Sequence, residues 1–352
     1  MSTETALSAE IPDTDKIVVG GRVMPIRLAG MVSLELRPVT RDQAEEICAL
    51  INRCEEHDGV PRVLSVEELL EDFDSPFVDV AVDTRAAYRD DALAGWGWVW
   101  NPPSEVAQEK AYLFGEVDPA HRGTGVGRTL LAWCLTRAEE RLRSRDHDLP
   151  RYIRVDAFDE LEDRHRLYAR FGFSPVRWFE ELARPLTELP PVEVPAGVVL
   201  VPWPNDRDEE LLVVCNAAFA DHWGSTPMDA ETWHQQLHGH GARLNVSVVA
   251  LDDASGEVVA VCLNHAYPED DERTGRREAW IHNPGTLREW RKRGVASALI
   301  TWSLHAFAES GFTHAMLGVD ADNPTGAARL YRDLGFELER RSTTREVELG
   351  AH

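Results

Sequence analysis

Two glycine-containing segments bring basic side chains to the start of an apolar helical pattern. Glycines let the backbone approach an anion closely, and the first turn of a helix presents unpaired N–H groups at the positive end of its dipole. We therefore expect each segment to bind a phosphate group, together with Thr286 and Leu287 directly before the downstream one. The downstream residues are Arg291, Lys292, Arg293, Gly294, Val295, Ala296 and Ser297, and the upstream residues are Arg122, Gly123, Thr124, Gly125, Val126, Gly127 and Arg128.

A tyrosine follows each segment and is the next feature that could do chemistry. Tyr168 and Tyr331 each stand four residues before a Gly-Phe pair. A phenol can donate a proton, or its ring can simply pack in a core. Packing without a chemical role has more weight for Tyr168 than for Tyr331. Arg122 and Arg291 are 169 residues apart and the two tyrosines 163, which indicates two copies of one unit.

General-base candidates precede the downstream segment. Glu278 and His282 lie on or next to an expected strand, and either could accept a proton from a substrate. A surface position without a chemical role explains each of them equally well. His234 and His238 have a spacing of four that metal ligands use, but no Glu or Cys stands beside them, so no metal site is expected.

Composition and charge exclude several classes of protein. The 352 residues include 37 basic and 61 acidic side chains, and the net charge of −24 disfavours nucleic acid and anionic membrane as partners. The five cysteines are scattered, and no stretch approaches the ~18 apolar residues of a membrane span. We expect a cytoplasmic monomer or homodimer whose acceptor is cationic or neutral.

Hydrophobic periodicity predicts the same order of elements twice, in an α/β (α+β) fold. Each copy is expected to contain a strand, two helices and three strands before its glycine segment, then a helix, a strand, a helix and a strand. One of these strands is expected to begin within residues 77–82, and the alternation of Trp96, Trp98 and Trp100 favours packing on a sheet. The predicted divisions are an extension (1–33), a first domain (34–185), a proline-rich linker (186–197) and a second domain (198–349).

The glycine segments read Arg122-x-x-Gly125-x-Gly127 and Arg291-x-x-Gly294-x-Ala296, each between an expected strand and an expected helix. In this context, and with both trailing helices ending in Tyr-x-x-x-Gly-Phe, the chain resembles the GNAT superfamily of N-acetyltransferases. The resemblance implies two tandem GNAT domains, each a mixed, splayed central sheet flanked by helices. It also implies acetyl-CoA as the acyl-donor cosubstrate, bound at the glycine segments, and direct transfer of acetyl to a primary amine of a small molecule.

Further roles follow from the resemblance alone. Tyr331 is implied as the general acid at the sulfur, Asn323 as a ligand of the pantetheine arm, and Tyr168 as part of the first cofactor site. The region that walls the acceptor pocket in this superfamily corresponds here to Asp221, His222 and Trp223.

Each copy departs once from the pattern. Glu160 takes the place of Asn323 in the first, and Pro284 falls in the strand that should run into the downstream turn. Proline removes a backbone donor and bends a strand, which leaves the state of that cofactor site open. The first domain is therefore expected to be degenerate or cofactor-holding and the second catalytic. Two alternatives stay open: a non-catalytic acyl-CoA sensor or interaction protein, and a protein N-acetyltransferase.

Overall fold

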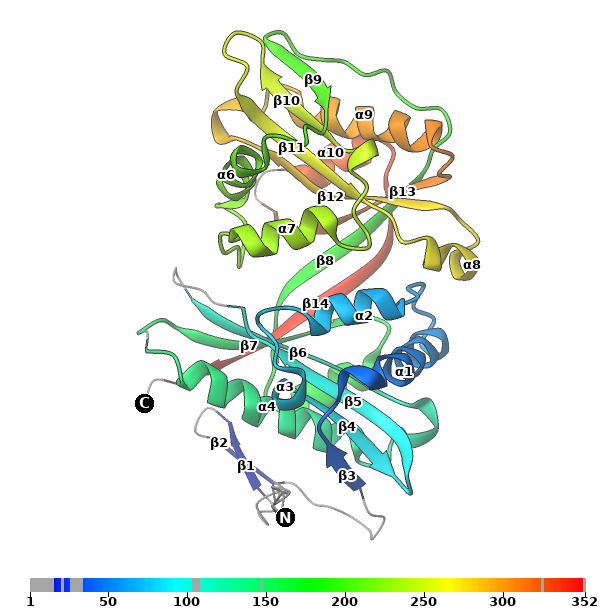
Figure 1. The fold of residues 1–352 in the computed structure, drawn as a ribbon, viewed down its shortest axis with the longest axis vertical. Coiled ribbons are helices and arrows are strands. Elements are labelled where there is room, and N and C mark those ends of the chain that lie inside the picture. Colours follow the sequence, from blue (N-terminus) through cyan, green and yellow to red (C-terminus); the bar gives the residue numbers. More distant parts are fainter. Residues whose placement is uncertain are drawn as a thin grey trace, which may run out of the picture.

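The computed structural model describes residues 16–19, 22–25, 34–102, 108–146, 148–323 and 326–350. Two halves are stacked along the long axis, the N-terminal half below the C-terminal half (Figure 1). Most of the expected extension, residues 1–33, lies outside the described residues, except for the antiparallel pair β1 (Lys16–Val19) and β2 (Arg22–Pro25). Among the described helices, none combines the length and the hydropathy that crossing a membrane requires.

The N-terminal half has the element order that the periodicity predicts, with one addition. Ser65 caps its second helix, where the Ser65 side chain and Glu68 exchange hydrogen bonds with each other's backbone N–H group. Its elements are β3 (Leu34–Arg37), α1 (Ala44–His57), α2 (Val66–Phe73), α3 (Val80–Asp83), β4 (Thr84–Arg89), β5 (Ala92–Trp100), β6 (Glu109–Val117), α4 (Val126–Arg143), β7 (Arg151–Phe158), α5 (Glu162–Arg170) and β8 (Ser174–Pro185).

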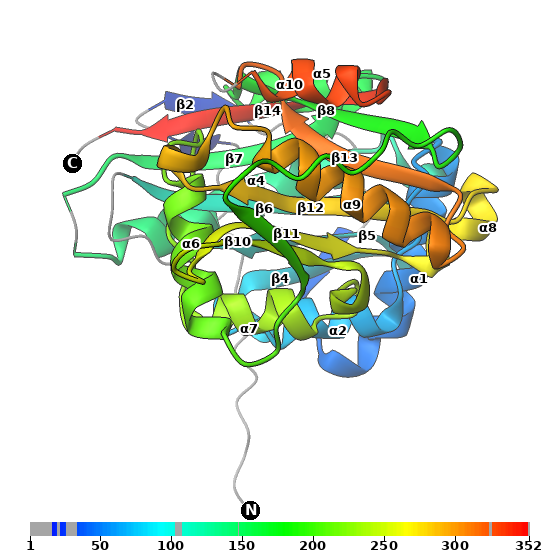
Figure 2. The ribbon, with the colours of Figure 1, turned by 90° about the horizontal axis from the view of Figure 1, so that it is seen from above.

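The C-terminal half repeats this order with two differences: a 3-10 helix (Leu244–Val246) stands in place of α3, and the short helix α8 is added between β11 and β12. Figure 2 shows α9 and α10 on one face of its sheet and α6 and α7 on the other, and the buried side chains form one core on each face. Its elements are β9 (Val198–Pro202), α6 (Asp208–Phe219), α7 (Ala230–His238), β10 (Val248–Asp252), β11 (Val258–His265), α8 (Asp271–Thr274), β12 (Glu278–Thr286), α9 (Val295–Glu309), β13 (His314–Asp320), α10 (Ala327–Asp333) and β14 (Glu337–Leu349).

One twelve-stranded sheet runs through both halves, in the order β3-β4-β5-β6-β7-β14-β8-β13-β12-β11-β10-β9. The last strand of the chain, β14, pairs with β7 of the first half, and β8 of the first half pairs with β13 of the second. Both strands cross the middle of the molecule in Figure 1. Each half therefore completes its sheet with a strand from the other, and the predicted domain boundaries at 185 and 198 stay a prediction.

The structure tests three expectations about local structure, which concern residues 77–82, the tryptophans of β5 and Pro284. The expectation of a strand in residues 77–82 is wrong, because the Asp79 carboxylate accepts from the Ala81 amide and starts the short helix α3. The tryptophan interpretation is confirmed: Trp96 and Trp98 are buried in one cluster with α1 and α2. Pro284 does not interrupt β12, which stays paired with β11 at that residue.

Candidate active site

The two glycine segments adopt the same conformation at the start of a long helix. Gly125 and Gly294 are the N-cap residues of α4 and α9, with φ angles of 97° and 90°, a left-handed region that suits glycine. The first helical hydrogen bond of α9 joins the Ala298 amide to the Gly294 carbonyl at 3.0 Å. The amides of the turn before it are therefore free to bind an anion, as the sequence predicts.

An arginine fixes each turn to its own half. Arg122 Nε donates to the carbonyl at the end of β6 at 3.1 Å, and its other nitrogens bond to Asp58. Arg291 donates to the carbonyl at the end of β12 at 3.1 Å and to Asp221 at 2.9 Å. Asp58 and Asp221 are 163 residues apart, as are Tyr168 and Tyr331, so they are the same position in the two units. Both guanidinium groups hold the turn in place, and their contact with phosphate stays a prediction.

Replacing Asp58 by Asn should destabilise the protein more than replacing Asp221 by Asn. The Asp58 side chain is 6% exposed and pairs with both Arg122 and Arg164, so the change leaves the partly buried Arg122 without its anion and Arg164 with Glu116 alone. We expect a loss of about 2–3 kcal/mol in the free energy of unfolding. Asp221 is 41% exposed, and ion pairs of this kind contribute little. Urea denaturation measures the difference, and equal losses would contradict an anchoring role specific to Asp58.

The central strands part beside each turn. β6 pairs with β7 only from Glu109 to Tyr112, and β12 pairs with β13 only from Glu278 to Ile281. Beyond these points β6 and β12 continue toward the glycine turns, hydrogen-bonded on one side only, to β5 and β11. The unpaired backbone groups of β6 and β12 face an opening that leads from the turn toward the centre of the sheet.

A β-bulge marks the parting point in the second half only. Leu263 pairs with Asn283 and Asn264 with Ile281, which leaves His282 as the extra residue of β12. The His282 side chain is exposed, and its ring stacks on that of His265 with centroids 4.2 Å apart and planes 8° apart. Desolvation by the protein atoms around the imidazole lowers the pKa of His282 to about 4 although the residue is partly exposed at the surface, so the imidazole is neutral at pH 7 and able to accept a proton.

Glu278, the other general-base candidate, lies where β12 and β13 are still paired. It is three residues before the last pair, roughly 10 Å along the strand. Its carboxylate is buried, 2.9 Å from Arg276 Nε, and burial raises its pKa to about 7 despite that cation. The structure therefore brings His282, rather than Glu278, to the opening.

The two tyrosines occupy corresponding positions in different surroundings. Tyr331 is 6% exposed, its ring centroid lies 6.2 Å from that of Phe336, and its hydroxyl has no hydrogen-bond partner among the described residues. Burial raises its pKa, so the phenol keeps its proton at neutral pH. Tyr168 packs against Phe173 at 6.0 Å, and its pKa is also raised by burial although the Arg164 guanidinium opposes this.

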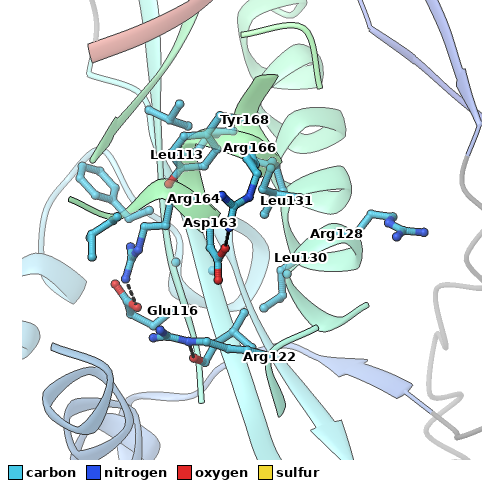
Figure 3. Close-up of a pocket in the computed structure, with 18 of the residues that line it drawn as sticks. Leu113, Glu116, Arg122, Arg128, Leu130, Leu131, Asp163, Arg164, Arg166 and Tyr168 are labelled. Carbon is cyan, nitrogen blue, oxygen red and sulfur yellow. Dashed lines mark hydrogen bonds and ion pairs between the residues drawn. The ribbon is translucent and has the colours of Figure 1, made fainter. Parts of the chain in front are cut away.

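A cavity of about 720 Å³ opens beside the glycine turn of the first half. Figure 3 shows Leu113 and Tyr168 at one end and Leu130 and Leu131 on the α4 wall. Glu116 from β6 is paired with Arg164 from α5 across this cavity. The cavity is lined by six of the predicted cofactor residues of the first half, whereas Thr124 and Val126 do not line it, and it extends to the parted strands. The six are Arg122, Gly123, Gly125, Gly127, Arg128 and Tyr168.

The three predicted acceptor residues lie on the loop after α6. Asp221 is paired with Arg288 as well as Arg291, which lowers its pKa. Half-buried His222 packs on Phe219 at 4.6 Å, and burial lowers its pKa. Trp223 lies 4.2 Å from the guanidinium of Arg154, on β7 of the other half. As placed, Asp221 supports the turn and Trp223 joins the halves, and their contact with an acceptor stays a prediction.

The remaining predicted cofactor residues surround the second turn. The Thr286 hydroxyl is buried without a hydrogen-bond partner among the described residues, which suits a ligand contact. The Leu287 amide donates to β11 at 3.0 Å, and the Asn323 amide closes a turn with the Asp320 carbonyl at 3.0 Å. Glu160, in the place of Asn323, lines the first cavity. The flanking positions 324 and 325 lie outside the described residues.

A cluster that could hold a metal forms where the halves meet, away from His234 and His238. In the described part of the chain, ligand atoms of Glu68, His240 and Glu269 lie within 4.8 Å of one another. His240 Nε2 is already 2.8 Å from Glu269, and Glu68 accepts hydrogen bonds from the helix cap at Ser65. These groups satisfy one another, and we assign them no metal.

Sequence reasoning missed Asp58 and Arg164. It also missed that the arginine of each turn pairs with an aspartate at the end of the first helix of its half. The internal repeat carried the signal, because Asp58 and Asp221 share the offset of the two tyrosines. Arg164 had no such counterpart: it pairs with both Asp58 and Glu116 through contacts that only the fold creates.

Comparison with known proteins gives matches to both halves. Residues 209–336 match the profile described as "Acetyltransferase (GNAT) family", and residues 82–175 match "Acetyltransferase (GNAT) domain". A mycothiol acetyltransferase of Thermobispora bispora is 31% identical over 87% of this chain and 96% of the relative. Another from Mycobacterium sp. (strain JLS) is 32% identical over 88% and 96%.

Solved structures give the same picture. A GCN5-related N-acetyltransferase from Sphaerobacter thermophilus superposes with a TM-score of 0.71 at 26% identity, over 90% of this chain and 96% of the other. A tandem GNAT protein of the clavulanic acid biosynthesis pathway superposes with a TM-score of 0.66 at 18% identity, over 91% and 100%. The two-unit arrangement predicted from the repeat is thus shared with both structures.

Proposed function

Because this chain belongs to the GNAT acetyltransferase family and is an N-acetyltransferase, we propose that it transfers acetyl from acetyl-CoA to a primary amine of a small molecule. The observation that carries the proposal is the arrangement of the second half. There the Gly294 turn, the parted strands β12 and β13 and the bulged His282 lie along one opening. When bound, acetyl-CoA supplies the activated acyl group, and the residues of this half position it and move protons.

The second half is proposed as the catalytic one, because it alone places a base candidate at the parting point. Arg122 and Arg291 are 169 residues apart, and the residue 169 positions before His282 is Leu113 of β6. The side chain of Leu113 cannot accept a proton. Asn323 likewise has Glu160 as its counterpart. The first half, with an intact glycine turn and a cavity, is proposed to hold an acyl-CoA molecule without transferring its acyl group.

A small acceptor is favoured over a protein by what covers the second half. The segment around α2 of the first half bonds to loops beside β11 and β12: the Val63 amide donates to Asp270 at 2.5 Å and the His240 amide to Glu71 at 2.9 Å. Arg273 also reaches the Val60 carbonyl at 3.3 Å. These contacts cover those loops with the first half and so reduce the room for a polypeptide chain beside them. Because the relatives are named mycothiol acetyltransferases, an amine of the mycothiol type is the first acceptor to test.

Release of CoA thiol in the presence of acetyl-CoA and a panel of amines tests the proposal. We expect thiol release only with a primary amine acceptor, together with a product heavier by one acetyl group in mass spectrometry. Binding of acetyl-CoA without thiol release across small amines and peptides would instead support the sensor alternative.

The pH dependence of kcat distinguishes the two base candidates. The pKa of His282 is lowered to about 4, so its basic form is complete above about pH 5 and kcat should stay flat between pH 6 and 8. The pKa of Glu278 is raised to about 7, so a reaction that depended on its carboxylate would slow as the pH falls through 7. We expect His282→Gln to lower kcat by about tenfold, below the usual range for a base because its basicity is low. An acid limb near pH 7 that vanishes in Glu278→Gln would assign the base to Glu278.

A further inference from the structure

The cavity of the first half continues from its polar mouth into the protein core. Arg122, Gly123 and Gly125 lie at the mouth. The inner wall is apolar and buried: Trp96, Leu113, Leu130, Leu131 and Cys134 are each at most 7% exposed. These side chains belong to three separate packing clusters, so the cavity enters the interior where the clusters meet.

Side chains that line an empty apolar space lack the van der Waals contacts that packed atoms would provide. A ligand that fills it recovers those contacts and removes its own apolar surface from water. The mouth, in contrast, presents helix amides and a glycine turn that favour an anion. The shape and polarity of this cavity therefore suit a ligand with an anionic head and an apolar tail.

The second half is built differently at the corresponding positions. The repeat places His282, Pro284 and Ser303 where the first half has Leu113, Gly115 and Cys134. Gly97 pairs with Gly115 on the neighbouring strand, just as Cys262 pairs with Pro284. Two glycines and a leucine are thus replaced by larger or polar side chains in the half proposed to transfer acetyl.

A buried polar network occupies this place in the second half. Cys262 Sγ lies 3.5 Å from Ser303 Oγ, and Asn264 Nδ2 donates to that oxygen at 2.9 Å and to the Val246 carbonyl at 2.6 Å. Cys262, Asn264 and Ser303 are all 0% exposed. An apolar chain entering here would have to displace hydrogen-bonded groups, which is costly.

We propose that the first-half cavity binds an acyl-CoA whose acyl chain is longer than acetyl, with the chain inserted between Leu113, Leu131 and Cys134. The inference rests on the proposed role of the Gly125 turn in holding coenzyme A. The second half, filled at the same positions, is limited to acetyl. The two units of this chain therefore bind thioesters of different chain length, and the first retains its ligand because Leu113 offers no base.

Calorimetry on the full-length chain tests this, with Gly294→Val included so that the second turn does not contribute. CoA, acetyl-CoA and hexanoyl-CoA are titrated in turn. A buried methylene contributes roughly fourfold in affinity, so hexanoyl-CoA should bind at least about tenfold more tightly than acetyl-CoA. The wild-type chain should bind acetyl-CoA at two sites.

Two cavity-filling variants provide the matched controls. A Cβ atom at position 97 would lie 3.0 Å from Cys134 Sγ and 3.8 Å from Leu130, so a valine there crowds the side chains that line the cavity, and Gly97→Val should remove the chain-length preference. CoA itself, which has no acyl chain, should bind as before. Leu131→Phe fills the same space from α4 and replaces Gly97→Val if the latter lowers the melting temperature strongly.

Each outcome decides the proposal. Equal affinities for acetyl-CoA and hexanoyl-CoA would overturn the chain-length inference and leave the proposed function intact. If a folded Gly294→Val chain binds none of the three compounds, the cofactor-holding role of the first half is wrong, and the inference fails with it. A preference for hexanoyl-CoA that survives both filling variants would place the acyl chain outside this cavity and also overturn the proposal.

Discussion

Tyr331→Phe is expected to lower the turnover number by about 10²-fold and to leave the affinity for acetyl-CoA within about twofold. The change removes one hydroxyl, which has no hydrogen-bond partner among the described residues, and keeps the ring that packs against Phe336. The fold should therefore hardly be affected. What is lost is a protonated phenol beside the opening between β12 and β13, available to a departing thiolate.

Steady-state kinetics and calorimetry on one preparation separate these effects. The matched control is Tyr168→Phe, the same change at the corresponding position of the first half, for which we expect turnover within twofold of the wild type. An unchanged turnover number in Tyr331→Phe would remove the tyrosine from the reaction. A large loss in Tyr168→Phe would mean that the first half also transfers acyl groups.

Local features of the fold could be predicted where the physical cause is local. The glycine segments predicted a helix start at Gly125 and Gly294, and both residues have the left-handed backbone that only glycine adopts easily. The helix cap at Ser65 likewise has a local cause, since its side chain accepts from the Glu68 amide three residues on. Where the cause is a single competing side chain, prediction failed: Asp79 converts an apparent strand into α3.

The exchange of β8 and β14 could not be predicted, because it depends on pairing between residues at least 129 positions apart. Leu349 pairs with Arg151, and His314 with Pro185. The repeat correctly indicated two copies of one unit, but either copy could have completed its own sheet with the same sequence pattern. Which strands pair is decided only when the whole sheet assembles, and the sequence of a single strand does not indicate its partner.

The sequence indicated which residues could form the candidate site, but not which residues of the other half they contact. His282 lies on β12, as the expected strand implied, and Tyr331 lies in α10; their roles in the reaction stay predictions. Trp223, expected in an acceptor wall, lies over Arg154 of the other half, a contact that the sequence did not indicate, and the Gly224 carbonyl accepts from Lys110. Burial lowers the pKa of that lysine to about 8, which reflects how closely the halves pack here. A sequence motif describes a single unit, so it cannot predict contacts between the two units.

Comparing the two units explains why one fold can serve two purposes. The turns and their arginine anchors are the same in both, so the anion-binding end is common. The difference lies deeper, where Leu113 and Gly97 face a cavity in one half and His282 and Cys262 stand in the other. The two units thus share the turn that is proposed to bind the nucleotide and differ at the positions that are proposed to meet the acyl group.

Gly294→Val is expected to abolish acetyl-CoA binding at the second half and to reduce turnover by more than about 10²-fold. A Cβ atom at this position meets nothing within 4 Å, so the effect is one of backbone conformation rather than of a clash. At φ 90° a β-branched residue is strained by a few kcal/mol, and the turn must rearrange to relieve this. Rearrangement moves the amides of Val295 and Ala296 away from the anion they are proposed to bind.

The matched control is Gly294→Asn, whose side chain is longer than that of valine but which tolerates a left-handed backbone. We expect it to keep measurable affinity, because the amide positions depend on φ and not on the volume at Cβ. Calorimetry should then show two acetyl-CoA sites in the wild type, one in Gly294→Val and two in Gly294→Asn. Undiminished binding in Gly294→Val would contradict the turn as the phosphate site, and equal losses in both variants would show that side-chain bulk, rather than backbone conformation, is what the site excludes.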